Sequence, residues 1–175
     1  MENTRFFALL IGVMSFTSLA AQIEKPVETE SEYEKNYAWR IRQERLDGVY
    51  IPRDLVNSFE ELNRLIDANA KQKFKQAPEE EAFHKLYFSF GRWITQKWGF
   101  YEGSRLSHYL RALGVYHPED MAKVVIVSYH RYLNKAPLEL KAQVQAIQEM
   151  RKKENEARLK KGTVISEERK KVERN

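Results

Sequence analysis

The chain has 175 residues, no cysteine and a formal net charge of +5 at pH 7. The lack of cysteine excludes disulfides, metal–thiolate sites and cysteine nucleophiles, and the length suits one domain with a sizeable core. The excess positive charge lies at the C-terminal end, because residues 151–175 hold ten Lys or Arg and five Glu, whereas residues 22–150 hold nineteen of each sign and are neutral.

Residues 1–21 have the pattern of a secretory signal peptide. An apolar run from Phe6 to Leu19 ends in the small residues Ala20 and Ala21. The run is shorter than the roughly 20 residues that a membrane-spanning helix needs, so a retained anchor is the weaker alternative. We therefore expect cleavage after Ala20 or Ala21 and a periplasmic or secreted protein with no transmembrane segment after cleavage.

Residues 22–48 are predicted to form a polar linker followed by an N-terminal helical arm. The helix is expected to run from Ser31 to Leu46 and to end at Gly48, with one weakly apolar side formed by Tyr33, Tyr37 and Ile41. Because this side is narrow, we expect the arm to dock only loosely on the rest of the protein.

The core domain is predicted to span residues 49–150 and to begin with two amphipathic helices. The first is expected to start with Pro52 at its first helical position, and its apolar side chains repeat at three and four residues: Leu55, Phe59, Leu62 and Ile66. The second follows Pro78, is expected to stop by Gly99, and carries an apolar stripe of Phe83, Leu86, Tyr87, Phe90 and Ile94.

The later part of the core domain contains three further helix patterns. Ser104 is predicted to cap a short helix that stops at Gly114. Pro118 is predicted to start a mostly buried helix, with the acidic Glu119 and Asp120 near its positive end. A last helix is expected from Pro137 to about Met150 and to continue into a charged helical tail, residues 151–175, that frays after Gly162. No alternating strand pattern is found, so the sequence predicts an all-α fold: a small orthogonal or bundle-like domain with helical N- and C-terminal extensions.

A polar strip is expected on the helix that begins at Pro118. It contains Glu119, Lys123, His130 and Asn134, with Arg131 at its border. One interpretation is that the strip faces water. The other is that it lines a shallow pocket for an anionic group together with Arg105 and His108, since arginine supplies a bidentate fork and histidine a titratable donor.

Known catalytic patterns are absent from the sequence. Glu81 and His84 form one Glu-x-x-His pair, but a carboxylate-bridged metal site needs a second copy. The histidines are too scattered to predict a zinc site, and there is no G-x-S-x-G, G-x-G-x-x-G or phosphate-loop motif. We therefore expect no metal, no cofactor and no catalytic residue, and the sequence favours a protein that is not an enzyme.

Four blocks in the middle of the chain resemble the pattern of a known family: "VYIPRDL", "FGRWITQKWGF", "GSRLSHYLRALGVYHPEDM" and "SYHRYLN". They are similar to an uncharacterised bacterial domain family of unknown function, with the pattern I-P-x-D-L, W-G, S-R-L-x-x-Y, H-P-D-D-M and S-Y-H-R-x-L-N. The resemblance covers residues 49–134 and implies no activity. Polar motif residues that packing does not obviously explain, together with the histidine of the suggested pocket, are the candidate ligand-binding residues: Arg105, His108, His117, His130, Arg131 and Asn134.

Three functions remain open on these grounds. The first is an exported, non-enzymatic helical module that binds a protein or a cell-envelope component. The second is a small anionic-ligand binder, or an acid–base enzyme, that uses the cluster Arg105, His108, His130 and Arg131. The third is electrostatic binding of acidic polymers through the basic tail, where no aromatic residue interleaves with the bases, so that nucleic acid is not favoured. The oligomeric state is left open.

Overall fold

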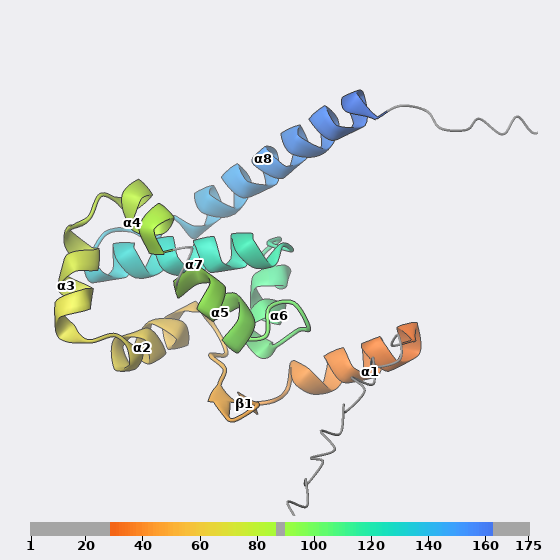
Figure 1. Cartoon of the computed structure of the whole chain (residues 1–175), viewed down its shortest axis with the longest axis horizontal. Coiled ribbons are helices and arrows are strands. Elements are labelled where there is room, and N and C mark those ends of the chain that lie inside the picture. Colours follow the sequence, from red (N-terminus) through yellow and green to blue (C-terminus); the bar gives the residue numbers. More distant parts are fainter. Residues whose placement is uncertain (1–28, 87–89, 163–175) are drawn as a thin grey trace, which may run out of the picture.

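The computed structural model describes residues 29–86 and 90–162, and the segments predicted as signal peptide and distal tail lie outside this part (Figure 1). Its elements are α1 (Glu30–Arg40), β1 (Arg45–Leu46), β2 (Val49–Tyr50), α2 (Leu55–Leu65), α3 (Ala68–Gln76), α4 (Glu79–Leu86), α5 (Arg92–Lys97), α6 (Arg105–Ala112), α7 (Pro118–Leu133) and α8 (Leu140–Lys161). The predicted all-α class is confirmed, because the strands of the described residues form only one small hairpin.

Helix α7 forms the centre of the domain. It contacts α2, α3, α4, α5, α6 and α8, which surround it (Figure 1). As predicted, Pro118 occupies the start of this helix, where a missing N–H costs nothing. Its apolar residues are almost fully buried: Met121, Ala122, Val124, Val125, Ile126 and Tyr129. The prediction of a mostly buried helix is therefore confirmed, and this helix organises the core.

The three tryptophans lie at different depths in the fold. Trp98 follows α5 and has no exposed surface. Trp93 is partly buried and stacks on Phe90, with ring centres 5.9 Å apart. Trp39 is on α1 and is 57% exposed. Burial of large aromatic surfaces makes the region around Trp98 a main source of hydrophobic stabilisation.

The N-terminal helix ends earlier than predicted. Helix α1 stops at Arg40, and the residues predicted as its last turn form strand β1 of the hairpin. Asp47 and Gly48 have φ values of 48° and 78° and connect the two strands, which pair Arg45 with Tyr50. An Asp-Gly pair with both φ values positive gives the turn that matches the twist of a hairpin. The prediction of a helix to Leu46 was wrong because this turn signal dominates.

Two further differences concern the start of the core domain. Helix α2 begins at Leu55, not Pro52, because Asp54 is its N-cap and accepts a hydrogen bond of 2.8 Å from the Asn57 N–H. Helix α3 was not predicted. Its only buried residue is Phe74, so it has almost no apolar periodicity to reveal it. The helix predicted between Pro78 and Gly99 corresponds to α4 and α5, with residues 87–89 outside the described part.

Helices α6 and α8 begin and end close to the positions predicted from the sequence. Ser104 caps α6 in a reciprocal arrangement with Ser107, and Gly114 follows the helix with a φ of 94°. Helix α8 begins at Leu140, slightly later than predicted, and runs without interruption into the charged segment before it ends at Gly162. Its outer turns project away from the other helices (Figure 1).

The N-terminal arm is attached mainly through polar contacts, which include an ion pair of 3.9 Å between Arg40 and Glu102 and the Arg111 guanidinium 5.6 Å from the centre of the Tyr37 ring. The Tyr37 hydroxyl and His108 Nδ1 lie 3.1 Å apart, and Arg40 Nε donates to the Gly103 carbonyl at 2.9 Å. No residue of α1 is buried. The Tyr37 ring lies so close to Gly103 that a Cβ atom there would overlap it. Docking of the arm therefore requires glycine at position 103, because any side chain there would overlap the Tyr37 ring.

Gly103→Ala is expected to release α1 from the core. Gly103 has a φ of 96°, so alanine adds backbone strain of about 1 kcal/mol to the overlap with Tyr37. Gly48→Ala is the matched control, because Gly48 also has a positive φ but has no atom within 4 Å of the added Cβ. Hydrogen exchange of the α1 amides should become several-fold faster in Gly103→Ala only. Equal exchange in both variants would contradict this docking.

Candidate functional site

A groove of about 500 Å³ lies between α4, α7 and α8. The apolar residues of its lining, here called the floor, come from all three helices and range from buried (Val127, Ile147) to exposed (Ala142, Ala146): Phe83, Val127, Ala142, Ala146, Ile147 and Met150. Its polar lining contains charges of both signs and one amide: Glu79, Glu80, Lys123, Arg131, Glu139 and Gln143. The size is within the range of ligand sites, and an apolar floor with a polar rim is the usual anatomy of a binding surface.

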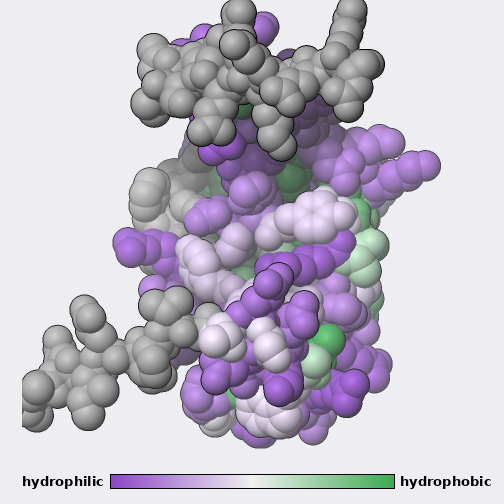
Figure 2. Space-filling view, turned by 90° about the vertical axis from the view of Figure 1, so that its right-hand side faces the viewer, coloured by the Kyte–Doolittle hydropathy of each residue, from purple (hydrophilic) through white to green (hydrophobic). Residues whose placement is uncertain are grey.

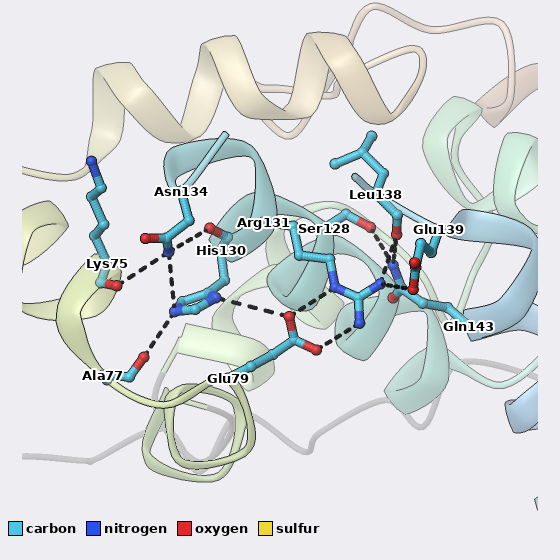
Figure 3. A network of polar contacts seen from close by, with 10 residues as sticks. All are labelled: Lys75, Ala77, Glu79, Ser128, His130, Arg131, Asn134, Leu138, Glu139 and Gln143. Carbon is cyan, nitrogen blue, oxygen red and sulfur yellow. Dashed lines mark hydrogen bonds and ion pairs between the residues drawn. The ribbon is translucent and has the colours of Figure 1, made fainter. Parts of the chain in front are cut away.

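Arg131 fixes one end of this groove (Figure 3). Its guanidinium donates to both Glu79 carboxylate oxygens, at 2.8 and 2.7 Å, and to the Leu138 carbonyl at 2.9 Å. Glu139 lies 3.6 Å away on the other side. The hydrogen bonds from Arg131 lower the pKa of Glu79, and the same bonds raise the pKa of Arg131. One side chain therefore joins the start of α4 to the connection between α7 and α8.

His130 and Asn134 belong to the same corner of the fold (Figure 3). His130 is only 8% exposed, and its Nε2 donates to the Ala77 carbonyl at 2.9 Å. Asn134 Nδ2 donates to the Lys75 carbonyl at 3.1 Å. The interpretation that His130 faces water was wrong, because the C-terminal end of α3 and the segment after it cover this side of α7. Sequence analysis had not predicted α3.

Arg105 and His108 lie in a different environment. Arg105 Nε donates to the Ile51 carbonyl at 2.6 Å, and its guanidinium lies 5.1 Å from the centre of the Tyr50 ring. His108 contacts Tyr37 of the arm. These two side chains therefore hold the hairpin segment and α1 against α6. Neither of them lines the groove, whereas Arg131 does.

The six candidate residues thus divide among three places. Arg105 and His108 hold the N-terminal segments, and His130, Arg131 and Asn134 join α7 to α3 and α4. His117 lies at the start of α7 beside the middle of α8, in a second hollow. The described residues do not bring Arg105 and His130 to a common partner, so the predicted convergence around one anion is not formed by them.

Two elements of the site were not predicted from the sequence. The partner of Arg131, Glu79, is 52 positions away, and no local pattern links the two. The alanines Ala142 and Ala146 on α8 form the other missed element. They lie four residues apart on one side of the helix, next to the recognised apolar residues, so a small-residue search on that helix could have found them.

The groove has few features of proton-transfer chemistry. Within the groove, the hydrogen bonds from Arg131 lower the pKa of Glu79 below its ordinary value. Efficient acid–base catalysis at neutral pH instead requires groups with a pKa near the working pH. Among the described residues, no group of three His, Asp or Glu side chains could hold a metal ion.

The described helices also include none that is both long and apolar enough to cross a membrane. The family comparison agrees with the resemblance noted from the sequence: a family model described as "Domain of unknown function (DUF6794)" matches residues 51–133. No curated protein and no solved structure gives a significant match. The match covers the segment from the end of the hairpin through α7, which contains Arg131 and its partner Glu79 but not Leu138 and Glu139.

Proposed function

We propose that the chain, whose residues 51–133 match the model of the DUF6794 family of unknown function, is an exported, non-enzymatic module that binds a segment of a partner protein in the groove between α4, α7 and α8. The observation that carries this proposal is the apolar floor of the groove at a junction of three helices. The export part rests on the signal-peptide pattern of residues 1–21.

The shape of the groove favours a helical or extended protein segment with apolar side chains. Ala142 and Ala146 lie on the α8 wall, and such small side chains allow another backbone to come close. Phe83 and Met150 supply larger apolar surface for contact. A helix that places apolar residues into a groove is a common mode of peptide recognition.

The charges around the groove limit what can enter it. Glu79 and Glu139 both lie beside Arg131, so their charges are partly compensated. Lys123 Nζ lies 5.3 Å from the centre of the Phe83 ring, at the edge of the apolar floor. A partner segment would therefore keep its apolar side on the floor and its polar groups at this rim.

Another face of the molecule has less contiguous apolar surface for such a partner to contact. The side that lies at the right in Figure 1 is mostly hydrophilic, with hydrophobic residues in small separate patches (Figure 2). Single exposed apolar residues are normal on a soluble protein, whereas contiguous apolar areas indicate interaction sites. The groove is therefore the stronger docking candidate.

Ala146→Glu tests the groove directly. A glutamate at this position would place a charge on the apolar floor, and burial of an unpaired charge should reduce partner binding at least tenfold. Gln145→Glu is the matched control, because Gln145 is exposed on the same helix and does not line the groove. Each variant would be crosslinked to an envelope extract of the producing cell, and partners would be identified by mass spectrometry.

The expected result is a partner that crosslinks to the wild type and Gln145→Glu but not to Ala146→Glu, while all three unfold at similar urea concentrations. Retention of the partner by Ala146→Glu would refute the groove as the binding site. The export part is tested on the same cells: the mature chain should begin at Ala21 or Gln22, and an intact N-terminus would argue against cleavage.

A further inference from the structure

A second hollow of about 500 Å³ lies where the middle of α8 passes the start of α7. It is separate from the groove and shares no lining residue with it. One side chain comes from the segment before α7 and the others from α8: His117, Arg151, Lys152, Glu154, Asn155 and Arg158. Four of these six side chains are basic, which distinguishes this hollow from the mixed charges of the groove.

The charges in this hollow are not balanced. Glu154 is the one carboxylate in the lining, and it already accepts a hydrogen bond of 3.1 Å from Arg151. Arg158 donates at 3.0 Å to the side-chain oxygen of Asn155, which is neutral. Lys152 is exposed in the same lining. The positive charges of Lys152 and Arg158 therefore remain available to an anion.

The acidic residues at the start of α7 do not cancel these charges. Asp120 accepts two hydrogen bonds from Arg151, at 2.7 and 2.9 Å. Glu119 accepts a hydrogen bond of 3.2 Å from the Tyr101 hydroxyl. Arg151 is shared by Asp120 and Glu154 and neutralises one of them, so Lys152 and Arg158 together leave the hollow with a net positive charge.

The same Asp120–Arg151 pair holds the hollow in shape. It joins α7 to the middle of α8, and Asp120 is only 4% exposed. Because the pair fixes the start of α7 against α8, His117 already lies beside Lys152 and Arg158 before a ligand binds. Such preorganisation increases affinity without additional contacts.

We propose that this hollow binds a phosphate group of an anionic polymer that continues along the outer half of α8. The available cationic side chains are Arg158 and Lys152 of α8, and His117 adds a donor from the segment before α7. Together they suit a group with three or more acceptor oxygens better than a carboxylate, which has two. Lys160 and Lys161 extend the positive charge beyond the hollow. Among the described residues, the lining has no Phe, Tyr or Trp, the usual platforms on which nucleic-acid bases stack, so we favour a phosphate-bearing chain other than single-stranded nucleic acid.

The test measures binding of inorganic polyphosphate of one defined length to the chain without residues 1–21. Lys152→Ala combined with Arg158→Ala should weaken binding about tenfold and reduce the slope of log affinity against log salt by about 1.5. Lys73→Ala combined with Lys141→Ala is the matched control, because it removes the same charge from exposed positions on α3 and the first turn of α8, away from the hollow and from the outer half of α8. This control should stay within about twofold of the wild type.

Two further measurements separate this site from general electrostatic attraction. A chain that ends at Gly162 keeps the whole hollow and should bind polyphosphate like the longer chain, whereas a chain that ends at Met150 would remove Arg151 and break the pair with Asp120. Polyglutamate of equal charge should bind at least fivefold more weakly than polyphosphate. Equal losses in the two double variants, loss of binding on truncation at Gly162, or equal binding of polyglutamate would each overturn the proposal.

Discussion

Arg151→Ala should lower the free energy of unfolding by about 3 kcal/mol, a large effect for a residue of the segment predicted as a charged tail. Arg151 donates two hydrogen bonds to Asp120, whose side chain is 6% exposed. Removing the guanidinium leaves a buried carboxylate without this partner. The positive end of α7 still stabilises that charge, which keeps the loss at the lower end of the range for buried pairs. Urea unfolding followed by circular dichroism measures the change.

Removing the acidic partner of this pair should lower the free energy of unfolding less than removing Arg151. Asp120→Ala leaves Arg151, which is one-third exposed and can turn toward water and Glu154, so a loss of about 1.5 kcal/mol is expected. In the Asp120→Ala background, Arg151→Ala should then cost less than about 1 kcal/mol. Lys153→Ala is the surface control and should stay within about 0.5 kcal/mol of the wild type. Equal losses for Arg151→Ala and Lys153→Ala would show that the pair contributes little.

Arg131→Ala should lower the free energy of unfolding by about 2 kcal/mol at pH 7, because it removes three hydrogen bonds that join α4, α7 and the segment before α8. Glu79 is 37% exposed, so water replaces part of the lost interaction and the expected cost is below that of a fully buried pair. Arg53→Ala is the control. Arg53 pairs only with its neighbour Asp54 in the described contacts and is 75% exposed, so its loss should cost less than about 0.5 kcal/mol.

The effect of Arg131→Ala should also depend on pH. Arg131 lowers the pKa of Glu79 in the folded protein, so the pair stabilises the fold when Glu79 is ionised. This contribution is present above the pKa of the unfolded state and is lost as the pH falls through the lower pKa of the folded state, from about pH 5 downward. The difference in stability between wild type and Arg131→Ala should therefore shrink between pH 7 and pH 3. A difference that stays constant over this range would contradict the role of Glu79.

Local signals account for the parts of the fold that were predicted well. The capping residue Ser104, the proline at the start of α7 and the glycines after α6 and α8 act over a few neighbouring residues, so they can be recognised in one sequence. The Asp47-Gly48 turn was equally local but was interpreted as a helix end. Helix α3 could not be found in this way, because Phe74 alone gives no periodicity.

The partners of the candidate site residues could not be predicted from one sequence, because they lie far away along the chain. Arg131 and His130 were selected because local packing did not explain them, and both contact residues more than fifty positions away. Which partner they meet is decided by how α3 and α4 pack on α7. For the same reason, the charge pattern of residues 151–175 predicted a solvated extension but not the attachment of Arg151 to Asp120.

The graded burial of the tryptophans gives the protein three built-in fluorescent reporters. Single-tryptophan variants would separate their signals: Trp39 should emit at long wavelength and be quenched readily by acrylamide, because it is 57% exposed. Trp98, with no exposed surface, should emit at shorter wavelength and resist quenching until the core opens. Movement of the N-terminal helix and unfolding of the core could thus be timed separately by stopped-flow fluorescence, each in its own single-tryptophan variant and without any attached dye.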